Sequence, residues 1–214
     1  MRSWLPVIVV ATVLVLSACS VVTGSGRVES ETREVSGFTR IDLSGSGEVT
    51  VVQGDVESLT VEADDNVLPV LTSDVSDSTL KLGAKSGTTV NTRNPIRYRV
   101  MIKDFTGISL SGSGSVIADD VKVGALRSDI SGSGSVELSG SADEQDIQVS
   151  GSGRYEAAGL TSEKVNAEIS GSGEVVVTVS GELKVDISGS GTVTYNGDPT
   201  VDESISGSGK LIKK

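Results

Sequence analysis

The tetrapeptide Ser-Gly-Ser-Gly occurs seven times in the 214-residue chain and constrains its fold more than any other feature. An aliphatic residue precedes every copy, and another apolar residue stands two positions after it. From the second copy onward, successive copies begin 20, 19, 20, 18 and 18 residues apart. A fixed period near twenty is typical of a stacked repeat. The copies begin at Ser44, Ser111, Ser131, Ser150, Ser170, Ser188 and Ser206.

Between the copies, apolar and polar residues alternate as they do in strands with one buried face. Counting back in twos from the aliphatic residue predicts an inward column that is mostly apolar and an outward column that is wholly polar. Gln145 and Glu203 are the inward exceptions, and Glu203 is expected to mark a frayed last coil. The inward sets are Leu126/Ser128/Ile130, Gln145/Ile147/Val149, Val165/Ala167/Ile169, Leu183/Val185/Ile187 and Val201/Glu203/Ile205. Their outward partners are Arg127/Asp129, Asp146/Gln148, Asn166/Glu168, Lys184/Asp186 and Asp202/Ser204.

Each period also contains a second turn signal, rich in Gly, Ser, Ala or Asp. Two strands and two turns per period describe a coil, and successive coils can hydrogen-bond strand on strand at about 4.8 Å. This predicts an all-β fold, a two-sheet β-solenoid built from coils of 18–20 residues. A sandwich of hairpins would show turn signals at a similar spacing, but it would not require the same tetrapeptide at every second turn.

The tetrapeptide suits the corner of such a coil, because identical corners stack directly above one another. Glycine reaches positive φ without a Cβ clash, and serine is small, with a hydroxyl that can bond the nearby backbone or the next coil. The glycines predicted to form these structural turns are Gly45, Gly47, Gly112, Gly114, Gly132, Gly134, Gly151, Gly153, Gly171, Gly173, Gly189, Gly191, Gly207 and Gly209.

The chain before this array alternates in strand fashion but lacks the period. We expect residues 33–106 to form an irregular β portion and residues 107–214 the regular solenoid, together one domain. Within the first portion, the sequence predicts a compact apolar loop or single helical turn at 67–71 and a loop at 85–95.

The N-terminus has the pattern of a lipoprotein leader. Residues 1–18 contain one arginine and an apolar run too short for a stable membrane anchor, which indicates a signal peptide. The run ends in Leu-Ser-Ala-Cys19, which resembles the bacterial lipobox and implies that Cys19 carries lipid after cleavage. An ordinary secretory leader with an incidental cysteine is the alternative. Residues 19–32 would then be the lipidated cysteine and a flexible tether, outside the cytoplasm at the cell membrane or outer membrane.

Composition excludes several classes of function. The net charge of −11 argues against nucleic acid as a partner, because nucleic acid demands a basic surface. The chain has no histidine and one cysteine, which removes Ser-His-Asp and Cys-His catalysis and the usual zinc sites. The residue after each Ser-Gly-Ser-Gly varies, which argues against a regular metal ladder. We therefore predict no cofactor, no metal and no enzymatic activity.

Adjacent carboxylates are the remaining candidates for a metal or catalytic site. Asp64-Asp65 and Asp119-Asp120 could bind calcium or share a proton, although solvated turn residues are the expectation. The stacked serine columns offer a hydroxylated edge that could touch sugars or a partner, with a purely structural turn ladder as the expectation.

A second set of carboxylates is predicted on one exposed sheet face. The outward Asp129, Glu168 and Asp186 could stack there, where like charges in register repel. Arg127 and Lys184 lie nearby and could simply balance them.

Three N-terminal motifs accompany the leader and the Gly-Ser-Gly array. They are Arg33-Glu34-Val35-Ser36-Gly37-Phe38-Thr39-Arg40-Ile41, Gln53-Gly54-Asp55 and Ser58-Leu59-Thr60-Val61-Glu62-Ala63-Asp64-Asp65-Asn66. With them, residues 33–212 resemble the bacterial family of putative auto-transporter adhesins with a head GIN domain. The resemblance implies a pectin-lyase-like, right-handed β-helix, and it brings no catalytic residues to this chain.

We therefore expect a lipid-anchored envelope protein that acts as a non-enzymatic surface adhesion or interaction module. Its partners would be the membrane, through lipidated Cys19, and a glycan or an envelope or extracellular protein; homo-oligomerisation is left open. An envelope structural or sensory lipoprotein that binds another envelope protein is the alternative. A polysaccharide-active enzyme of the same architecture is the least favoured reading.

Overall fold

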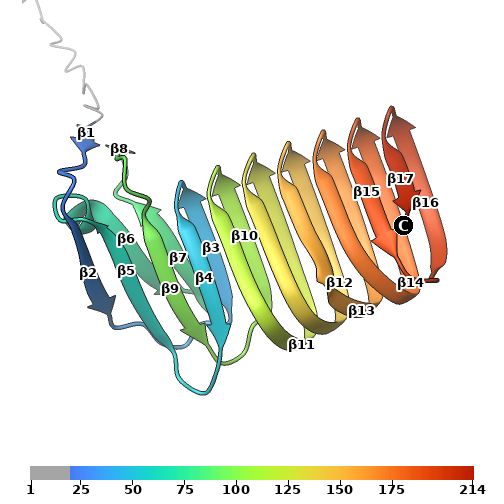
Figure 1. The fold of residues 1–214 in the computed structure, drawn as a ribbon, viewed down its shortest axis with the longest axis horizontal. Helices are drawn as coiled ribbons and strands as arrows, with labels where there is room; N and C mark the ends of the chain where they lie inside the picture. Colours follow the sequence, from blue (N-terminus) through green and yellow to red (C-terminus); the bar gives the residue numbers. More distant parts are fainter. Residues whose placement is uncertain (1–19) are drawn as a thin grey trace, which may run out of the picture.

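The computed structural model describes residues 20–214, so the expected leader and Cys19 lie outside the described residues. The described chain is almost entirely strand, with one 3₁₀ turn, and it forms the predicted β-solenoid (Figure 1). Among these residues there is no helix of the length and apolar character that a membrane crossing requires.

The two sides of the solenoid are named here after the Ser-Gly-Ser-Gly corners: the approach sheet leads into the corners, and the exit sheet leaves them. Four long strands pass through both sheets: β11 (Ser115–Gly132), β12 (Ser135–Gly151), β13 (Arg154–Gly171) and β14 (Glu174–Gly189). The approach sheet also contains β6 (Leu71–Ser76), β7 (Thr79–Ala84), β3 (Arg40–Gly45), β10 (Gly107–Gly112) and β16 (Thr200–Gly207). The exit sheet also contains β2 (Val28–Arg33), β5 (Ser58–Asp64), β9 (Arg97–Ile102), β4 (Glu48–Gln53), β15 (Thr192–Asn196) and β17 (Lys210–Lys213).

Each long strand runs from one corner down the exit sheet, bends, and returns up the approach sheet to the next corner (Figure 1). In these four coils the expected second turn is a bend within a continuous strand, because parallel pairing with the neighbouring coil continues on both sides of it. In the last coil it is a true turn, which separates β15 from β16. The bend is absorbed as a register shift, for example between Ala118 and Val121 of β11. At the corresponding bend of β12, Gly140 has a φ of +123°.

The Ser-Gly-Ser-Gly corners form a hydrogen-bonded column along one edge of the solenoid. The first glycine of every copy has a positive φ, between +103° and +128°. The amide of Ser133 donates to the carbonyl oxygen of Gly112 at 2.9 Å, and the amide of Ser135 donates to that of Gly114 at 3.1 Å. The same two bonds recur between the later corners, so the parallel ladder continues around the turn.

The first corner belongs to the same column as the others, although it lies outside the regular sequence period. Gly45 of β3 is paired with Gly112 of β10, and β4 is paired with the start of β11. The intervening strands β5, β6, β7 and β9 extend the solenoid on the opposite side of β3 and β4. Residues 54–106 are thus an insertion at the N-terminal end, which interrupts the period in sequence but not the stack in space.

The inward side chains fill the space between the two sheets, as the alternation predicts. Every member of the predicted inward sets from Leu126 to Ile187 is at most 2% exposed. Each large aliphatic side chain buried in this way contributes about 1.5–3 kcal/mol relative to an exposed one. The exception Gln145 is fully buried but satisfied: it accepts a hydrogen bond from Tyr155 Oη at 2.7 Å and donates one to Ser162 Oγ at 2.6 Å.

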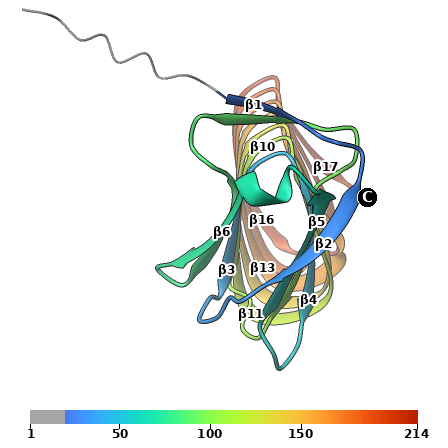
Figure 2. The same ribbon diagram turned by 90° about the vertical axis from the view of Figure 1, so that its left-hand side faces the viewer.

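The two ends of the solenoid differ. At the N-terminal end, β2 and the 3₁₀ turn η1 (Leu68–Val70) lie across the opening, and Val67 and Leu68 are buried there (Figure 2). At the C-terminal end all eight residues of β16 are exposed. The expectation of a frayed last coil, based on Glu203, is wrong, because β16 pairs with β14 from Thr200 to Gly207. Its exposure arises because no further coil covers it among the described residues.

The segment expected to be a flexible tether is ordered from Ser20 onward. β1 (Ser20–Thr23) pairs in parallel with β8 (Thr88–Asn91), inside the segment expected to be a loop, and β2 pairs antiparallel with β5. The polar composition of 20–33 conceals these strands, because both lie at the periphery and bury little apolar area. Of the two alternatives expected at 67–71, an apolar loop or a single helical turn, the structure shows the helical turn, η1.

Candidate interaction face

The outward side chains of the approach sheet stand in two straight columns, because the coils pair in parallel and in register. We call these two columns the interaction face. One column contains Arg40, Gly107, Arg127, Asp146, Asn166, Lys184 and Asp202. The other contains Asp42, Ser109, Asp129, Gln148, Glu168, Asp186 and Ser204. Neighbouring members of a column are one strand spacing apart, about 4.8 Å.

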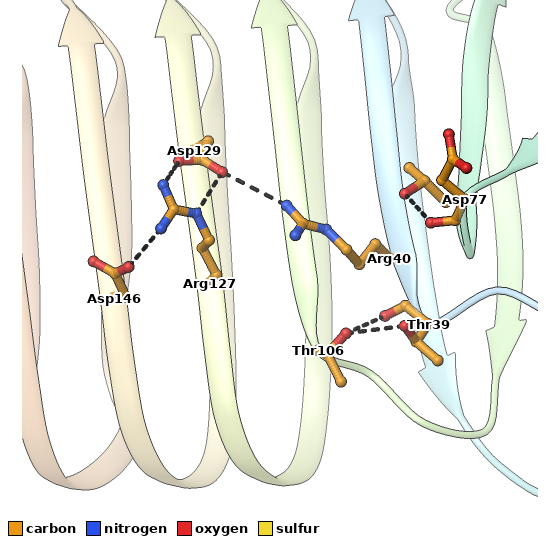
Figure 3. A network of polar contacts seen from close by, with 8 residues as sticks. Thr39, Arg40, Asp77, Thr106, Arg127, Asp129 and Asp146 are labelled. Carbon is orange, nitrogen blue, oxygen red and sulfur yellow. Dashed lines mark hydrogen bonds and ion pairs between the residues drawn. The ribbon is translucent and has the colours of Figure 1, made fainter.

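Arg127 is the centre of an ion-pair network on this face (Figure 3). Its Nε and Nη2 each donate to one carboxylate oxygen of Asp129 at 3.1 Å, and its Nη1 donates to Asp146 Oδ2 at 2.8 Å. These partners raise the pKa of Arg127, with the hydrogen bonds to Asp129 as the largest cause. The two parallel hydrogen bonds to Asp129 fix the orientation of the guanidinium, which a single contact from a lysine does not achieve.

Arg40 reaches the same carboxylate from two strands away (Figure 3). Its Nη2 lies 3.7 Å from Asp129 Oδ2, and its side chain crosses β10 at Gly107. A Cβ on Gly107 would lie 3.2 Å from Arg40 Nε, so the missing side chain leaves the path open. The contact was not predicted from the sequence. The feature that could have indicated it is Gly107, which lies in register between Arg40 and Arg127.

The three stacked carboxylates predicted on this face are only partly adjacent. Gln148 separates Asp129 from Glu168, whereas Glu168 and Asp186 are direct neighbours in register. Arg127 balances Asp129 as expected, but no ion pair of Lys184 is formed among residues 20–214. The face therefore has a paired end around Arg127 and an acidic end around Glu168 and Asp186.

The exit sheet carries a second, sparser set of outward charges. Arg97 pairs with Glu48 at 3.1 Å and with Glu62 at 3.0 Å, and Arg154 pairs with Glu174 at 2.9 Å. Strands β11 and β12 lie between the two groups, and their residues at this level are Ser115 and Ser135. The ion pairs of Arg97 are therefore not linked to the ion pair of Arg154. The approach sheet is consequently the more continuous charged surface.

The first aspartate pair, Asp64-Asp65, is not the solvated turn that was expected. Asp64 is 1% exposed and accepts hydrogen bonds from Thr92 Oγ1 at 2.8 Å and from Asn94 Nδ2 at 2.6 Å. Asp65 instead accepts from Ser25 Oγ and pairs with Arg27. The two carboxylates thus hold different segments in place: Asp64 holds residues 92–94, and Asp65 holds residues 25–27.

The second pair, Asp119-Asp120, is exposed at the bend of β11, as expected for solvated turn residues. Asp119 Oδ1 accepts a hydrogen bond from Ser139 Oγ at 2.9 Å, and Asp120 has a φ of +56°. Across residues 20–214 no group of three or more His, Cys, Asp or Glu side chains is placed to hold a metal ion. The corner serines likewise show no hydroxyl-to-hydroxyl bond from coil to coil in the described chain, where backbone bonds join the corners.

No aromatic ring of the described residues is fully exposed. Phe38, Phe105, Tyr98 and Tyr155 are at most 2% exposed, and Tyr195 is half-buried. Burial raises the pKa of Tyr98 to about 12. The interaction face therefore offers charges and hydrogen-bonding groups but no ring on which a sugar could stack.

The comparisons with known proteins point to one family and one architecture. The profile of the family described as "Putative auto-transporter adhesin, head GIN domain" matches residues 37–199. The crystal structure of a putative adhesin from Bacteroides fragilis has a TM-score of 0.69 and 23% identity, covering 90% of this chain and 100% of that chain. A search of curated proteins finds no match.

Two further crystal structures share the fold. A putative lipid binding protein from Parabacteroides distasonis has a TM-score of 0.55 and 25% identity, over 91% of this chain and 100% of that one. A putative adhesin from Parabacteroides merdae has a TM-score of 0.53 and 22% identity, over 91% and 99% of the two chains. Each covers the irregular N-terminal part as well as the regular coils.

Proposed function

Because the chain belongs to the putative auto-transporter adhesin, head GIN domain family, we propose that it is a lipid-anchored, non-enzymatic interaction module of the cell envelope. The observation that carries the proposal is the interaction face: outward polar residues in two straight columns on a rigid, parallel, in-register sheet. Such a surface holds many groups in fixed relative positions and can contact a partner along its length.

The chemistry of the face favours a protein partner with complementary charges. Arg127, Asp129 and Asp146 are about one-third to two-fifths exposed, so each keeps free hydrogen-bonding capacity while its geometry is fixed. Pre-ordered side chains lose less conformational entropy on binding than free ones. Proteins commonly bind sugars by stacking them on aromatic rings, and neither column of the interaction face contains an aromatic residue, so a glycan is the second ligand class.

The anchor in this proposal is Cys19, which directly precedes β1. The amide of Ser20 donates to the carbonyl oxygen of Gly87 at 2.9 Å, so the chain is tied to the fold one residue after the cysteine. Two or three acyl chains would hold the protein at a membrane, since each buried methylene contributes about 0.8 kcal/mol. The domain would then stand close to the bilayer.

The proposed non-enzymatic role rests on how the carboxylates are used. Asp129 and Asp146 are engaged by Arg127, and Asp64 and Asp65 by neighbouring loops. A glycosidase needs two carboxyl groups flanking a substrate at a defined separation, one of them with a raised pKa. The alternative role, a sensory or structural lipoprotein, would use the same face to bind an envelope protein. Only the identity of the partner distinguishes this role from adhesion.

The test is a binding screen with residues 19–214 carrying Cys19→Ala, against envelope and extracellular proteins, a glycan panel and lipid vesicles. The double variant Arg127→Ala/Asp146→Ala is expected to weaken binding about tenfold or more, by removing the centre of the face. The matched control Arg154→Ala/Glu174→Ala removes an ion pair of the exit sheet and should bind normally. Equal loss in both variants, or turnover of a polysaccharide, would contradict the proposal.

A further inference from the structure

The C-terminal end of the solenoid exposes residues that are buried in every coil before it. Ile187 and Leu183 are fully buried, whereas Ile205 and Val201, the equivalent residues one coil later, are 39% and 36% exposed. Stacked-repeat proteins require a polar cap on each terminal repeat. Here the N-terminal end has a cap, made by β2 and η1, and the C-terminal end presents an apolar inward pair instead.

The backbone of this end is unpaired as well. β16 pairs with β14 on one side, and β17 pairs with β15 on one side. Within the part of the chain that the structure describes, no strand pairs with their other sides. Such an edge presents a row of free amide and carbonyl groups and is a template for another strand.

We propose that this end is the interface of a two-fold homodimer, in which β16 of each copy pairs antiparallel with β17 of its partner. β16 runs toward the last corner and β17 runs away from it, on opposite sides of the solenoid (Figure 1). A two-fold axis parallel to the strands therefore places each β16 beside the other copy's β17, with opposite directions and both corners on the same edge. Both sheets and the apolar core then continue from one copy into the other.

The charges of the two strands are complementary in this arrangement. Counting away from the corner, the first inward residues are Ile205 and Leu211, and the second are Glu203 and Lys213. Across the two-fold axis, apolar therefore faces apolar and Glu203 faces Lys213, twice over. Glu203 is exposed in the single chain and forms no ion pair within residues 20–214. The dimer would bury it, and a buried carboxylate needs a cation beside it, which the partner's Lys213 would supply. Lys213 Nζ already lies 2.6 Å from Asp198 Oδ1 and can serve two carboxylates.

The other symmetric arrangement is disfavoured. An axis perpendicular to the sheets would pair β16 with β16 and bring Asp202 and Glu203 of both copies together, where like charges repel. A head-to-tail filament could use the free edges of β2 and β6 at the N-terminal end. It is disfavoured because η1 lies over the core there, so the exposed Ile205 and Val201 would meet no open core. An interface of one patch with itself closes after two copies.

The proposal is tested by measuring the oligomeric state of residues 19–214 with Cys19→Ala by analytical ultracentrifugation. This protein keeps every described strand. We expect a dimer that Glu203→Lys weakens about tenfold or more, and that Glu203→Lys/Lys213→Glu restores. Glu137→Lys is the matched control, since it makes the same charge change on the exposed side of β12 and should leave the dimer unchanged. A monomer throughout the micromolar range would overturn the proposal, as would association that ignores Glu203→Lys.

Crosslinking reports the pairing itself. Chains carrying Ile205→Cys and chains carrying Leu211→Cys should form a disulfide when mixed, because directly opposed residues bring their Cβ atoms to about 4.5–5.5 Å. Neither variant alone should crosslink efficiently. Strong crosslinking of Ile205→Cys with itself would show that β16 pairs with β16 and would contradict the arrangement proposed. Because each chain has a single cysteine, no intramolecular bond can mimic the result.

Discussion

A Cβ atom placed on Gly132 would lie 2.5 Å from the carbonyl oxygen of Gly112, the glycine at the same place in the preceding corner. Gly132 also has a φ of +120°, a conformation that side chains rarely adopt. The neighbouring coil thus forbids a side chain where the backbone already disfavours one. We expect Gly132→Ala to lower the free energy of unfolding by about 2–4 kcal/mol, measured by urea denaturation.

Gly45 separates the two causes. It has a φ of +103°, but a Cβ there would meet nothing within 4 Å because no corner precedes it in the stack. Gly45→Ala should therefore cost only the conformational part, about 1–2 kcal/mol. Gly124→Ala, in the same strand as Gly132 and with ordinary φ, should change stability by less than about 0.5 kcal/mol. Equal costs at Gly45 and Gly132 would show that stacking contributes nothing.

Asp64 makes the stability of the N-terminal part depend on pH. Hydrogen bonds from Asn94, then from Thr92, lower the pKa of Asp64 below its usual 3.8. A carboxyl whose pKa is lower in the folded state stabilises the fold above its unfolded pKa, and this contribution is lost as the pH falls through the folded value. We therefore expect the free energy of unfolding to fall below about pH 4. Asp64→Asn should lower stability at pH 7 and reduce this acid loss; an unchanged acid slope would contradict the assignment.

Much of the fold follows from the sequence because the regular coils repeat one local pattern. The alternation around Ile130, Val149 and Ile169 identifies the inward column, and the corner glycines fix where each coil turns. The sequence does not reveal that the corner at Gly45 stacks on Gly112, because an insertion separates them along the chain. It also conceals β1 and β2, whose polar residues pair at the periphery without burying an apolar face.

The candidate face could be predicted as a set of outward residues but not as a network. Arg127 and Asp129 are two apart in one strand, so their contact follows from local geometry. Asp146 joins them only because β11 and β12 pair with a 19-residue offset, and Arg40 joins only through the out-of-period coil. Register across coils, which the uneven spacing of 18–20 residues leaves open, is what the structure adds.

The buried polar cluster around Gln145 should behave as a unit. Tyr155→Phe removes the donor to Gln145 Oε1 and should cost about 1–2 kcal/mol, and Gln145→Leu should cost more because it leaves two hydroxyl groups unpaired. The double variant should cost less than the sum of the two. Additive costs in this double-mutant cycle, measured by urea unfolding, would show that the two side chains do not interact.

Ser128 is a buried polar residue of the preceding coil, and it is expected to behave in the opposite way. Its hydroxyl oxygen is fully buried near the hydroxyl of Tyr155, but it makes no hydrogen bond of normal geometry among residues 20–214. Ser128→Ala removes an unsatisfied polar atom, and we expect it to leave stability unchanged or raise it by up to about 1 kcal/mol. A loss above about 1 kcal/mol in the unfolding free energy would show that this hydroxyl is satisfied, for example by a buried water.

Replacement of Cys19 by alanine tests the anchor independently of any ligand. In cells that make the full chain, we expect the parent protein in the membrane fraction with incorporated fatty acid, and Cys19→Ala in the soluble fraction without it, because the acyl chains supply the membrane affinity. Ser20→Ala is the matched control: it leaves the cysteine in place and removes only the hydroxyl contact with Thr88. Fatty-acid labelling that survives Cys19→Ala would contradict lipidation at this residue. Membrane retention without labelling would instead show that the protein is held by a partner through its folded domain.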